Sequence, residues 1–521
     1  MRIAFREFSA LFAGKSQQVA ARALFASLIT DGKVLLVGAH GAFKSSMIRA
    51  LSSLISTKYA VAEKEFSDVR EVKEALSSAA SKLGVNLEEL ERNLVYGVNM
   101  KYGDAFGVKK LTLEIDEAYH EEAPRLKECG FSVKEEVRRL PSFVMLVSPS
   151  DEIQDYVGHP VTSKVLRGDW PPHLEKENSI AHAPFILLDE MFVNPKLAAA
   201  MHTFVNEKEI HYPGLGTIRT DYLLFAAATN PVNENYQTNP NLRNMATLDR
   251  FTICAFVSTP DSRSVEETIR KLEILKDVPP LIDEKTIFSA RSEVEKMPIE
   301  KDAEQKLMLL ADVLDSCFFS TAQLERRERG TSPFLIQHEC SLCVFKDTCL
   351  ARFASVSTTR FVISVKKVAK AVAYLSGKQK AEMEDVAAAI FYVLPHRAKW
   401  SEDFIEENGG DVQRAVVGLL ERFSYFLRKY EQDVKRVVEA SEKGDVTTLL
   451  TILGLNPNAP KEAVGDVAFV KALADQALKR AEATLLKHRD FLNDKKKEAT
   501  RQFLETAGDE ETLAGVELTR Q

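Results

Sequence analysis

The stretch that most constrains the fold is Val34–Met47, which reads VLLVGAHGAFKSSM. An apolar run of strand length ends at Gly38, a short loop of small residues follows, and helical spacing begins near Lys44. Such a loop can bind phosphate if its backbone N–H groups point inward, a lysine meets the phosphates, and a hydroxyl group reaches Mg²⁺. The stretch therefore predicts a strand, a phosphate loop and a helix.

One position departs from the usual pattern GxxxxGK[ST], because Phe43 stands where the last glycine is expected. A phenylalanine is tolerated there only if its φ angle is negative. Taken alone, the motif does not separate a phosphate loop from an ordinary strand, turn and helix. The predicted nucleotide-binding residues of this loop are Gly38, Ala39, His40, Gly41, Ala42, Phe43, Lys44, Ser45 and Ser46.

Short apolar runs recur along the first half of the chain, at residues 34–37, 143–147, 185–188, 222–228 and 252–257. Stretches with helical spacing lie between several of them, and this alternation is typical of a parallel sheet covered on both faces. Residues 1–260 are therefore expected to form one α/β domain. Residues 57–141 interrupt it with a helical pattern, an alternating strand pattern and a further charged helical stretch, so we interpret them as an insertion.

The rest of the chain has helical periodicity. Residues 261–397 contain two helical patterns separated near Gly377, a residue suited to ending a helix. Residues 398–521 are helical and highly charged, with a turn-like segment between two long patterns. We expect a helical domain after the α/β domain and an additional helical region at the C-terminus.

Polar residues follow two of the apolar runs, and an arginine precedes a third. Asp189 and Glu190 come directly after one buried strand, and Asn230 follows the next. An aspartate there can hold Mg²⁺, a glutamate can act as general base on the attacking water, and an amide can orient that water. Arg250 precedes the last run and is either a solvated charge or, in an oligomer, a residue that reaches the γ-phosphate of a neighbouring subunit.

The composition excludes some classes of protein. The 521 residues carry a formal net charge of −7, so there is no global basic field for nucleic acid, although a local patch would not be visible in this total. No uncharged apolar run reaches the 18 residues of a membrane-spanning helix, and the N-terminus does not resemble a signal peptide. These observations predict a cytoplasmic protein.

The elements in this order resemble the AAA+ ATPases, and within them the MoxR family and its RavA-like branch. The likeness runs from about Phe12 to Arg397, without the insertion and part of the lid. It rests on the loop, on the segment DEMFVNPKLAAAMHTFVNEKEIHYPGLG and on YLLFAAATNP. The RavA-like branch also has a non-glycine before the lysine, which implies that Phe43 is a variation on a working loop. The implied fold is an AAA+ parallel-sheet core with a helical lid over 261–397.

The resemblance also implies roles for single residues. Asn230 corresponds to sensor 1, Arg250 to the arginine finger and Arg360 to sensor 2 in the lid, while Arg243 is a rival for the finger. Trp170 and the hairpin tip YPGLG could line a central pore, or be exposed loops without such a role.

The sequence is compatible with three functions. The first is a ring-forming, Mg²⁺-dependent ATPase, expected as a homohexamer, that remodels or matures protein complexes together with a separate partner bearing a von Willebrand factor A domain and a protein client. The second is a nucleic-acid translocase, although the hairpin around YPGLG has Lys208 and Arg219 only at its base. The third is a scaffold that binds ATP without turnover, which the presence of both Asp189 and Glu190 disfavours.

A cysteine cluster predicts a second metal site. Cys340, Cys343 and Cys349 have the spacing C-x2-C-x5-C, with Cys317 or His338 as the fourth ligand. We expect structural Zn²⁺, with an iron–sulfur cluster as the alternative. The cysteines could also be ordinary core residues.

Overall fold

The computed structural model describes residues 1–105, 108–157, 179–212, 216–230, 245–315, 350–356 and 358–443, together with 445 and 447–448. By their contacts the residues divide into two compact units. The first comprises 1–300, 363–397 and 410–413, and the second comprises 301–362, 398–409 and 414–521. This division differs from the domain boundaries expected from the sequence, which remain a prediction.

The core of the first unit is a parallel sheet of the order β11-β1-β10-β7-β6. Its strands are β1 (Lys33–Val37), β6 (Ser142–Leu146), β7 (Phe185–Asp189), β10 (Leu224–Thr229) and β11 (Ile253–Phe256). Residues of β1, β7 and β10 are buried almost throughout, as expected for strands covered on both faces. The α/β prediction is thus confirmed, and each apolar run of the sequence forms one strand.

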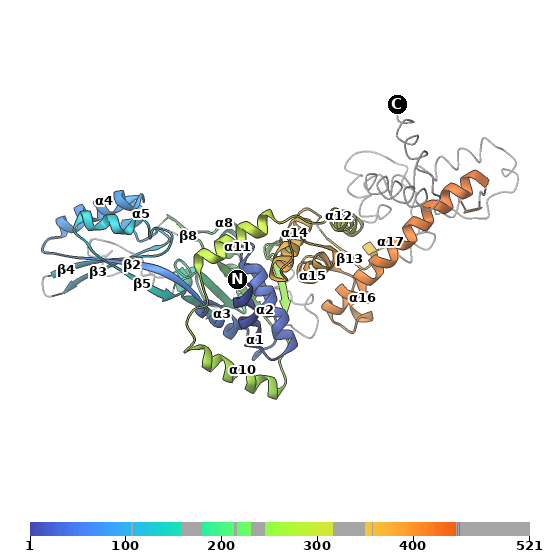
Figure 1. Ribbon diagram of the computed structural model, residues 1–521, viewed down its shortest axis with the longest axis horizontal. Helices are drawn as coiled ribbons and strands as arrows, with labels where there is room; N and C mark the ends of the chain where they lie inside the picture. Colours follow the sequence, from blue (N-terminus) through green and yellow to red (C-terminus); the bar gives the residue numbers. More distant parts are fainter. Residues whose placement is uncertain are drawn as a thin grey trace, which may run out of the picture. The chain divides into compact units, whose positions relative to one another are not determined.

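Helices cover this sheet (Figure 1). Those of the core are α1 (Arg2–Ala10), α2 (Lys15–Leu28), α3 (Lys44–Ser53), α6 (Ile153–Val157), α8 (Pro195–Glu207), α9 (Met245–Leu248), α10 (Ser262–Leu275) and α11 (Glu284–Lys296), with a 3-10 turn η2 (Met191–Val193). Helix α8 begins where the sequence indicates, because the Asn194 side chain accepts a hydrogen bond from the Leu197 N–H and Pro195 occupies the first turn. A hairpin of β8 (Glu209–Tyr212) and β9 (Gly216–Arg219) follows it.

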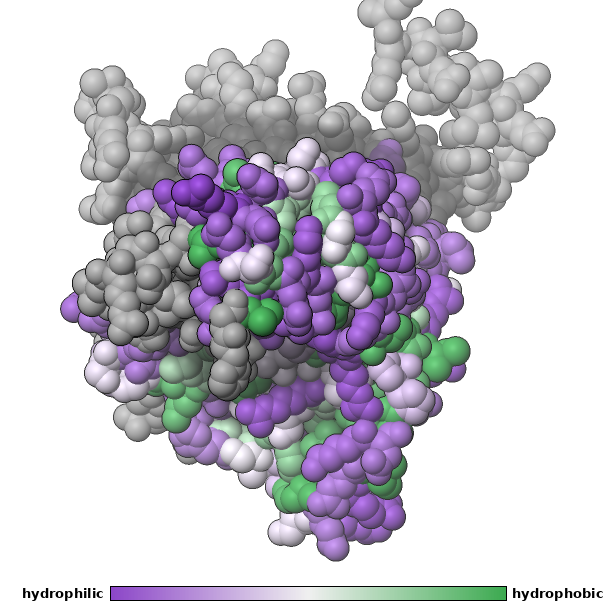
Figure 2. Space-filling view, turned by 90° about the vertical axis from the view of Figure 1, so that its left-hand side faces the viewer, coloured by the Kyte–Doolittle hydropathy of each residue, from purple (hydrophilic) through white to green (hydrophobic). Residues whose placement is uncertain are grey.

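The insertion is a separate antiparallel sheet with helices on one face (Figure 1). Its elements are β2 (Ile55–Phe66), α4 (Val69–Leu83), α5 (Leu87–Glu91), β3 (Val98–Ala105), β4 (Val108–Ile115), η1 (Ala123–Cys129) and β5 (Ser132–Arg139). The strand order β3-β4-β2-β5 is that of a split βαβ unit. Hydrophilic side chains cover most of its visible surface (Figure 2).

One expectation for the insertion is wrong. Its last part was expected to be a charged helix, but it contains the 3-10 helix η1 and the strand β5. Strand β5 pairs along β2, yet most of its side chains are exposed, including Val137 at 71%. Because neither face of β5 is buried, its sequence lacks the apolar alternation that would indicate a strand.

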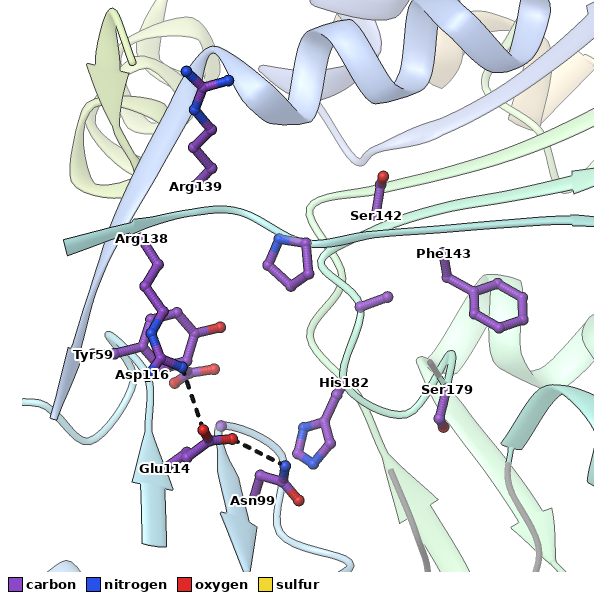
Figure 3. A pocket seen from close by; sticks show the side chains of 13 residues that line it. Tyr59, Asn99, Glu114, Asp116, Arg138, Arg139, Ser142, Phe143, Ser179 and His182 are labelled. Carbon is purple, nitrogen blue, oxygen red and sulfur yellow. Dashed lines mark hydrogen bonds and ion pairs between the residues drawn. The ribbon is translucent and has the colours of Figure 1, made fainter. Parts of the chain in front are cut away.

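The insertion joins the core through buried polar contacts. The Thr57 hydroxyl donates to the Glu284 carboxylate over 2.8 Å, and burial raises the pKa of Glu284 to about 7. The short strand β12 (Ile282–Asp283) pairs with the start of β2. Close by lies a cavity of about 250 Å³ whose lining includes Tyr59, Asp116 and His182 (Figure 3).

Two helices late in the chain also belong largely to the first unit. Helix α14 (Thr358–Leu375) is followed by Gly377, whose φ of 85° places it in the left-handed region, so a glycine ends this helix as expected. Helix α15 (Met383–Val393) then begins with a capping box formed by Glu382 and Asp385, and it packs on β11.

The second unit is mostly helical. It contains α12 (Lys301–Asp315), η6 (Leu350–Arg352), α16 (Glu402–Glu407) and most of α17 (Val412–Lys443), with a two-stranded ladder of β13 (Ala354–Ser355) and β14 (Lys399–Trp400). Helix α17 confirms the first of the two long C-terminal patterns. The second lies outside the described residues. In the described part of the chain, no helix is both long and apolar enough to cross a membrane.

Candidate active site

The candidate site lies at the carboxyl edge of the core sheet. Strands β1, β10 and β7 are neighbours and run parallel, so their carboxyl ends meet there. Each of these ends carries predicted site residues: the loop after β1, Asn230 after β10, and Asp189 with Glu190 at the end of β7. The sheet order thus brings together residues that are up to 190 positions apart in the sequence.

The loop after β1 is held close to the neighbouring strands. The Gly38 N–H donates to the Thr229 carbonyl over 3.0 Å, which extends the pairing of β1 with β10. A Cβ atom on Gly38 would lie 2.1 Å from the Val257 carbonyl oxygen, so only glycine fits at this position. The chain then turns through Gly41, with φ of 78°, into helix α3.

The conformation of Phe43 contradicts the condition set from the sequence. A negative φ was expected, but Phe43 has φ of 66° and lies in the left-handed region. This conformation costs a residue with a side chain on the order of 1 kcal/mol, because its Cβ approaches the following carbonyl. Phe43 therefore keeps the backbone shape of the glycine it replaces, and the loop retains its path at the expense of local strain.

Lys44 is buried at the centre of the site, with 4% of its side chain exposed. Its ammonium group donates to the Gly38 carbonyl and, over 3.1 Å, to the Asn230 side-chain oxygen, and it lies 3.9 Å from the Asp189 carboxylate. Burial lowers the pKa of Lys44, while the charges of Asp189 and Glu190 offset part of that effect. The lysine is thus positioned between the loop and the carboxylates.

Each of the two carboxylates has a buried oxygen that accepts no hydrogen bond from the described residues, and that of Asp189, Oδ1, is the atom 3.9 Å from the Lys44 ammonium group. Asp189 Oδ1 and Glu190 Oε1 are buried and have no hydrogen-bond partner among the described residues. Buried polar oxygens without a partner are costly, and a metal ion or a bound water would satisfy them. Glu190 has φ of 57°, a strained conformation that is often found at functional sites.

The donor set at this position fits Mg²⁺. One carboxylate from Asp189 and the hydroxyl of Ser45 are hard oxygen donors, and Mg²⁺ in nucleotide sites commonly takes few protein ligands together with phosphate and water. No cluster of three or more histidine, cysteine or acidic residues suited to a metal occurs in the described ranges, which is compatible with such a site.

Asn230 connects the parts of the site. Its backbone N–H donates to Glu190 over 3.4 Å, and its side-chain nitrogen lies 2.7 Å from the Nε2 of His40. The sequence predicts His40 as a residue of the loop but does not predict its contact with Asn230. Nothing in the local sequence indicates which strand end lies beside His40. Asn230 is therefore placed to orient a group between Glu190 and the loop.

Arg250 lies away from this cluster. It precedes β11, where the Thr252 N–H donates to the carbonyl of Lys33 at the start of β1. Because β1 and β11 are parallel, Arg250 is at the amino edge of the sheet, about 16 Å from the phosphate loop at the strand rise of roughly 3.3 Å per residue. Arg250 is thus separated from the phosphate loop of its own chain by the length of a strand.

The cavity shown in Figure 3 is not part of the candidate nucleotide site. It is lined by the start of β6, by the segment before β7 and by the insertion. The starts of parallel strands lie at the edge opposite their carboxyl ends, so the cavity and the phosphate loop are on opposite edges of the sheet.

The remaining predicted residues belong to the other compact unit or lie outside the described ranges. Arg360 is exposed in the first turn of α14, on the second compact unit. The following residues lie outside the described ranges: Trp170, Arg243, Cys317, His338, Cys340, Cys343, Cys349 and the tip of the β8–β9 hairpin. Their roles remain predictions.

Comparison with known proteins agrees with this architecture. Residues 346–416 match the family model described as the AAA lid domain. With the parallel core sheet and the phosphate loop at its carboxyl edge, this match identifies the fold. The chain has the AAA+ fold. Its helices α14 and α15 lie within the matched segment, which confirms the predicted lid in that part of this AAA+ chain.

Two solved structures are similar to the AAA+ chain. One is a candidate ATPase from Cytophaga hutchinsonii, which is 16% identical, with 80% of this chain and 92% of that chain covered and a TM-score of 0.49. The other is a full-length MCM homolog from Methanopyrus kandleri, which is 11% identical, with 76% of this chain and 59% of that chain covered and a TM-score of 0.32. No curated protein matches the sequence.

Proposed function

We propose that this AAA+ chain is a Mg²⁺-dependent ATPase. The observation that carries the proposal is the convergence of Lys44, Asp189, Glu190 and Asn230 at one edge of the sheet, with one buried oxygen of each carboxylate accepting no hydrogen bond among the described residues. Lys44 would meet the β- and γ-phosphates, and Ser45 and Asp189 would hold Mg²⁺. Glu190 would take a proton from the attacking water, which Asn230 would orient.

Phosphate release by the purified chain tests this activity. We expect turnover of ATP when Mg²⁺ is present and loss of turnover when Mg²⁺ is removed by a chelator, because the metal neutralises charge on the phosphates. Restoration by added Mg²⁺ is the control for damage by the chelator. A preparation that is folded and binds ATP but releases no phosphate under any of these conditions would favour the nucleotide-binding scaffold.

We further propose that the enzyme is a homo-oligomeric ring, expected as a hexamer, of the MoxR type. The support is the position of Arg250, which is a strand length away from its own phosphate loop, so that any contact it makes with a γ-phosphate would be with that of a neighbouring chain. In this proposal Arg360 would be sensor 2, with a separate partner bearing a von Willebrand factor A domain and a protein client.

The nucleic-acid translocase has less support. At the base of the β8–β9 hairpin, Lys208 pairs with Asp221, and Arg219 pairs with Glu209 over 2.9 Å. The open face of the insertion also pairs its basic residues with acids, as in Lys110 with Glu63 over 2.9 Å. Basic residues neutralised in this way offer little to a phosphate backbone.

The cysteine cluster keeps its proposed role as a structural Zn²⁺ site, with an iron–sulfur cluster as the alternative. Metal analysis of protein purified without oxygen is the test. About one zinc per chain and no visible colour would support the first, and iron with a brown colour the second. A chain free of both metals would exclude the site.

A further inference from the structure

Both sequence neighbours of Arg250 are bonded to the turn that follows the lid helix α15, at His396 and Arg397. The Arg397 guanidinium lies 2.7 Å from the Asp249 carboxylate and donates to the Phe251 carbonyl over 2.8 Å. The ring nitrogen Nε2 of His396 lies 2.7 Å from the same carbonyl. Arg250 therefore stands between two residues that the lid holds.

These contacts are buried, and they require a precise arrangement of the groups that form them. Only 4% of the Arg397 side chain is exposed, so Asp249 and the Phe251 carbonyl help to stabilise its buried positive charge. Burial, with the charge of Arg397, lowers the pKa of His396 to about 3. His396 is therefore neutral near pH 7, and its Nε2–H donates to the carbonyl of Phe251. A guanidinium fork and an imidazole on adjacent residues fix the backbone at 249–251 more strictly than a single bond would.

The Arg250 side chain itself is held weakly. Among the described residues, its guanidinium makes one hydrogen bond, from Nη1 to the His202 carbonyl over 3.4 Å, and its Nε is buried without a partner. The direction of this side chain must therefore be set largely by the backbone on either side of it, which is the part that His396 and Arg397 hold.

We propose that Arg397 and Asp249 form a latch that positions Arg250 and couples the lid to it. The proposal rests on the proposed function, in which Arg250 completes the active site of the neighbouring subunit. When nucleotide changes the position of α15, Arg397 and His396 would carry residues 249–251 with it. Arg397 is then a positioning residue, and it transmits the state of one nucleotide site to the next.

The Asp249→Asn variant tests the latch, because it keeps the size of the side chain and removes the charge. We expect kcat to fall by about 10- to 100-fold, as for a displaced catalytic group, with KM for ATP unchanged. Arg397→Lys keeps the positive charge but loses the two parallel donors of the guanidinium group, so it should also lower kcat. This variant replaces the first one if Asp249→Asn does not fold. Glu300→Gln is the matched control, since it removes another ion pair of the lid, with Lys380 at 2.9 Å, that does not contact residues 249–251.

A double substitution separates positioning from general damage. In an Arg250→Ala background, Asp249→Asn should cause no further loss of kcat, because its effect acts through Arg250. Additive losses, or a loss no larger than that of Glu300→Gln, would overturn the latch. Full activity of Arg250→Ala alone would refute the proposed role of Arg250. If Arg250→Ala is inactive but Asp249→Asn has normal activity, only the latch is refuted.

Discussion

The Glu190→Gln variant should bind ATP as tightly as the unsubstituted protein. It should hydrolyse ATP at least about 100-fold more slowly, which is the usual range for loss of a general base. Glu190 follows strand β7, and one of its carboxylate oxygens is buried without a hydrogen-bond partner among the described residues. Glutamine keeps the size of the side chain but cannot accept a proton. Stopped-flow binding of a fluorescent ATP analogue and steady-state phosphate release measure the two effects separately.

The matched control for this experiment is Glu74→Gln. Glu74 is an exposed carboxylate on α4 of the insertion, so the same change in charge is made away from the site. Its turnover should equal that of the original chain. Turnover by Glu190→Gln at the original rate would show that another group activates the water, and loss of ATP binding would show that Glu190 acts on the substrate rather than on the water.

Much of the core could be predicted because its strands are buried on both faces. Burial on both faces leaves a continuous apolar run in the sequence, and β7 and β10 were found in this way. The polar residues at the carboxyl ends then predicted the site, since parallel strands place those ends at one edge. Strand β5 was missed because its exposed side chains leave no such pattern.

Other features depend on contacts that no local pattern contains. The pairing of Arg397 with Asp249 spans 148 positions, and each residue alone reads as an ordinary charge. The same holds for His40 and Asn230, which meet only because β10 lies beside β1 in the sheet. The prediction of a negative φ for Phe43 is wrong, because the path of the loop, and not the residue type, determines the backbone conformation at this position.

If Arg250 of the next subunit completes each nucleotide site, exchange of chains within a ring has a defined outcome. This arrangement predicts that the Arg250→Ala and Lys44→Ala variants each lose activity, the first by roughly 10³-fold or more as for other arginine fingers. When the two are mixed, a site with an intact Lys44 can lie beside a chain with an intact Arg250. Random mixing in equal amounts makes about a quarter of the sites complete.

Phosphate release by rings reassembled from the two inactive variants is therefore the most direct test. The control is a chain with both substitutions, which should restore nothing when it is mixed with Arg250→Ala, because no intact Arg250 is then present. We expect the mixture of Arg250→Ala with Lys44→Ala to recover about a quarter of the activity of the unsubstituted protein. Mixed rings that are shown to contain both chains and remain inactive would contradict the proposed role of Arg250.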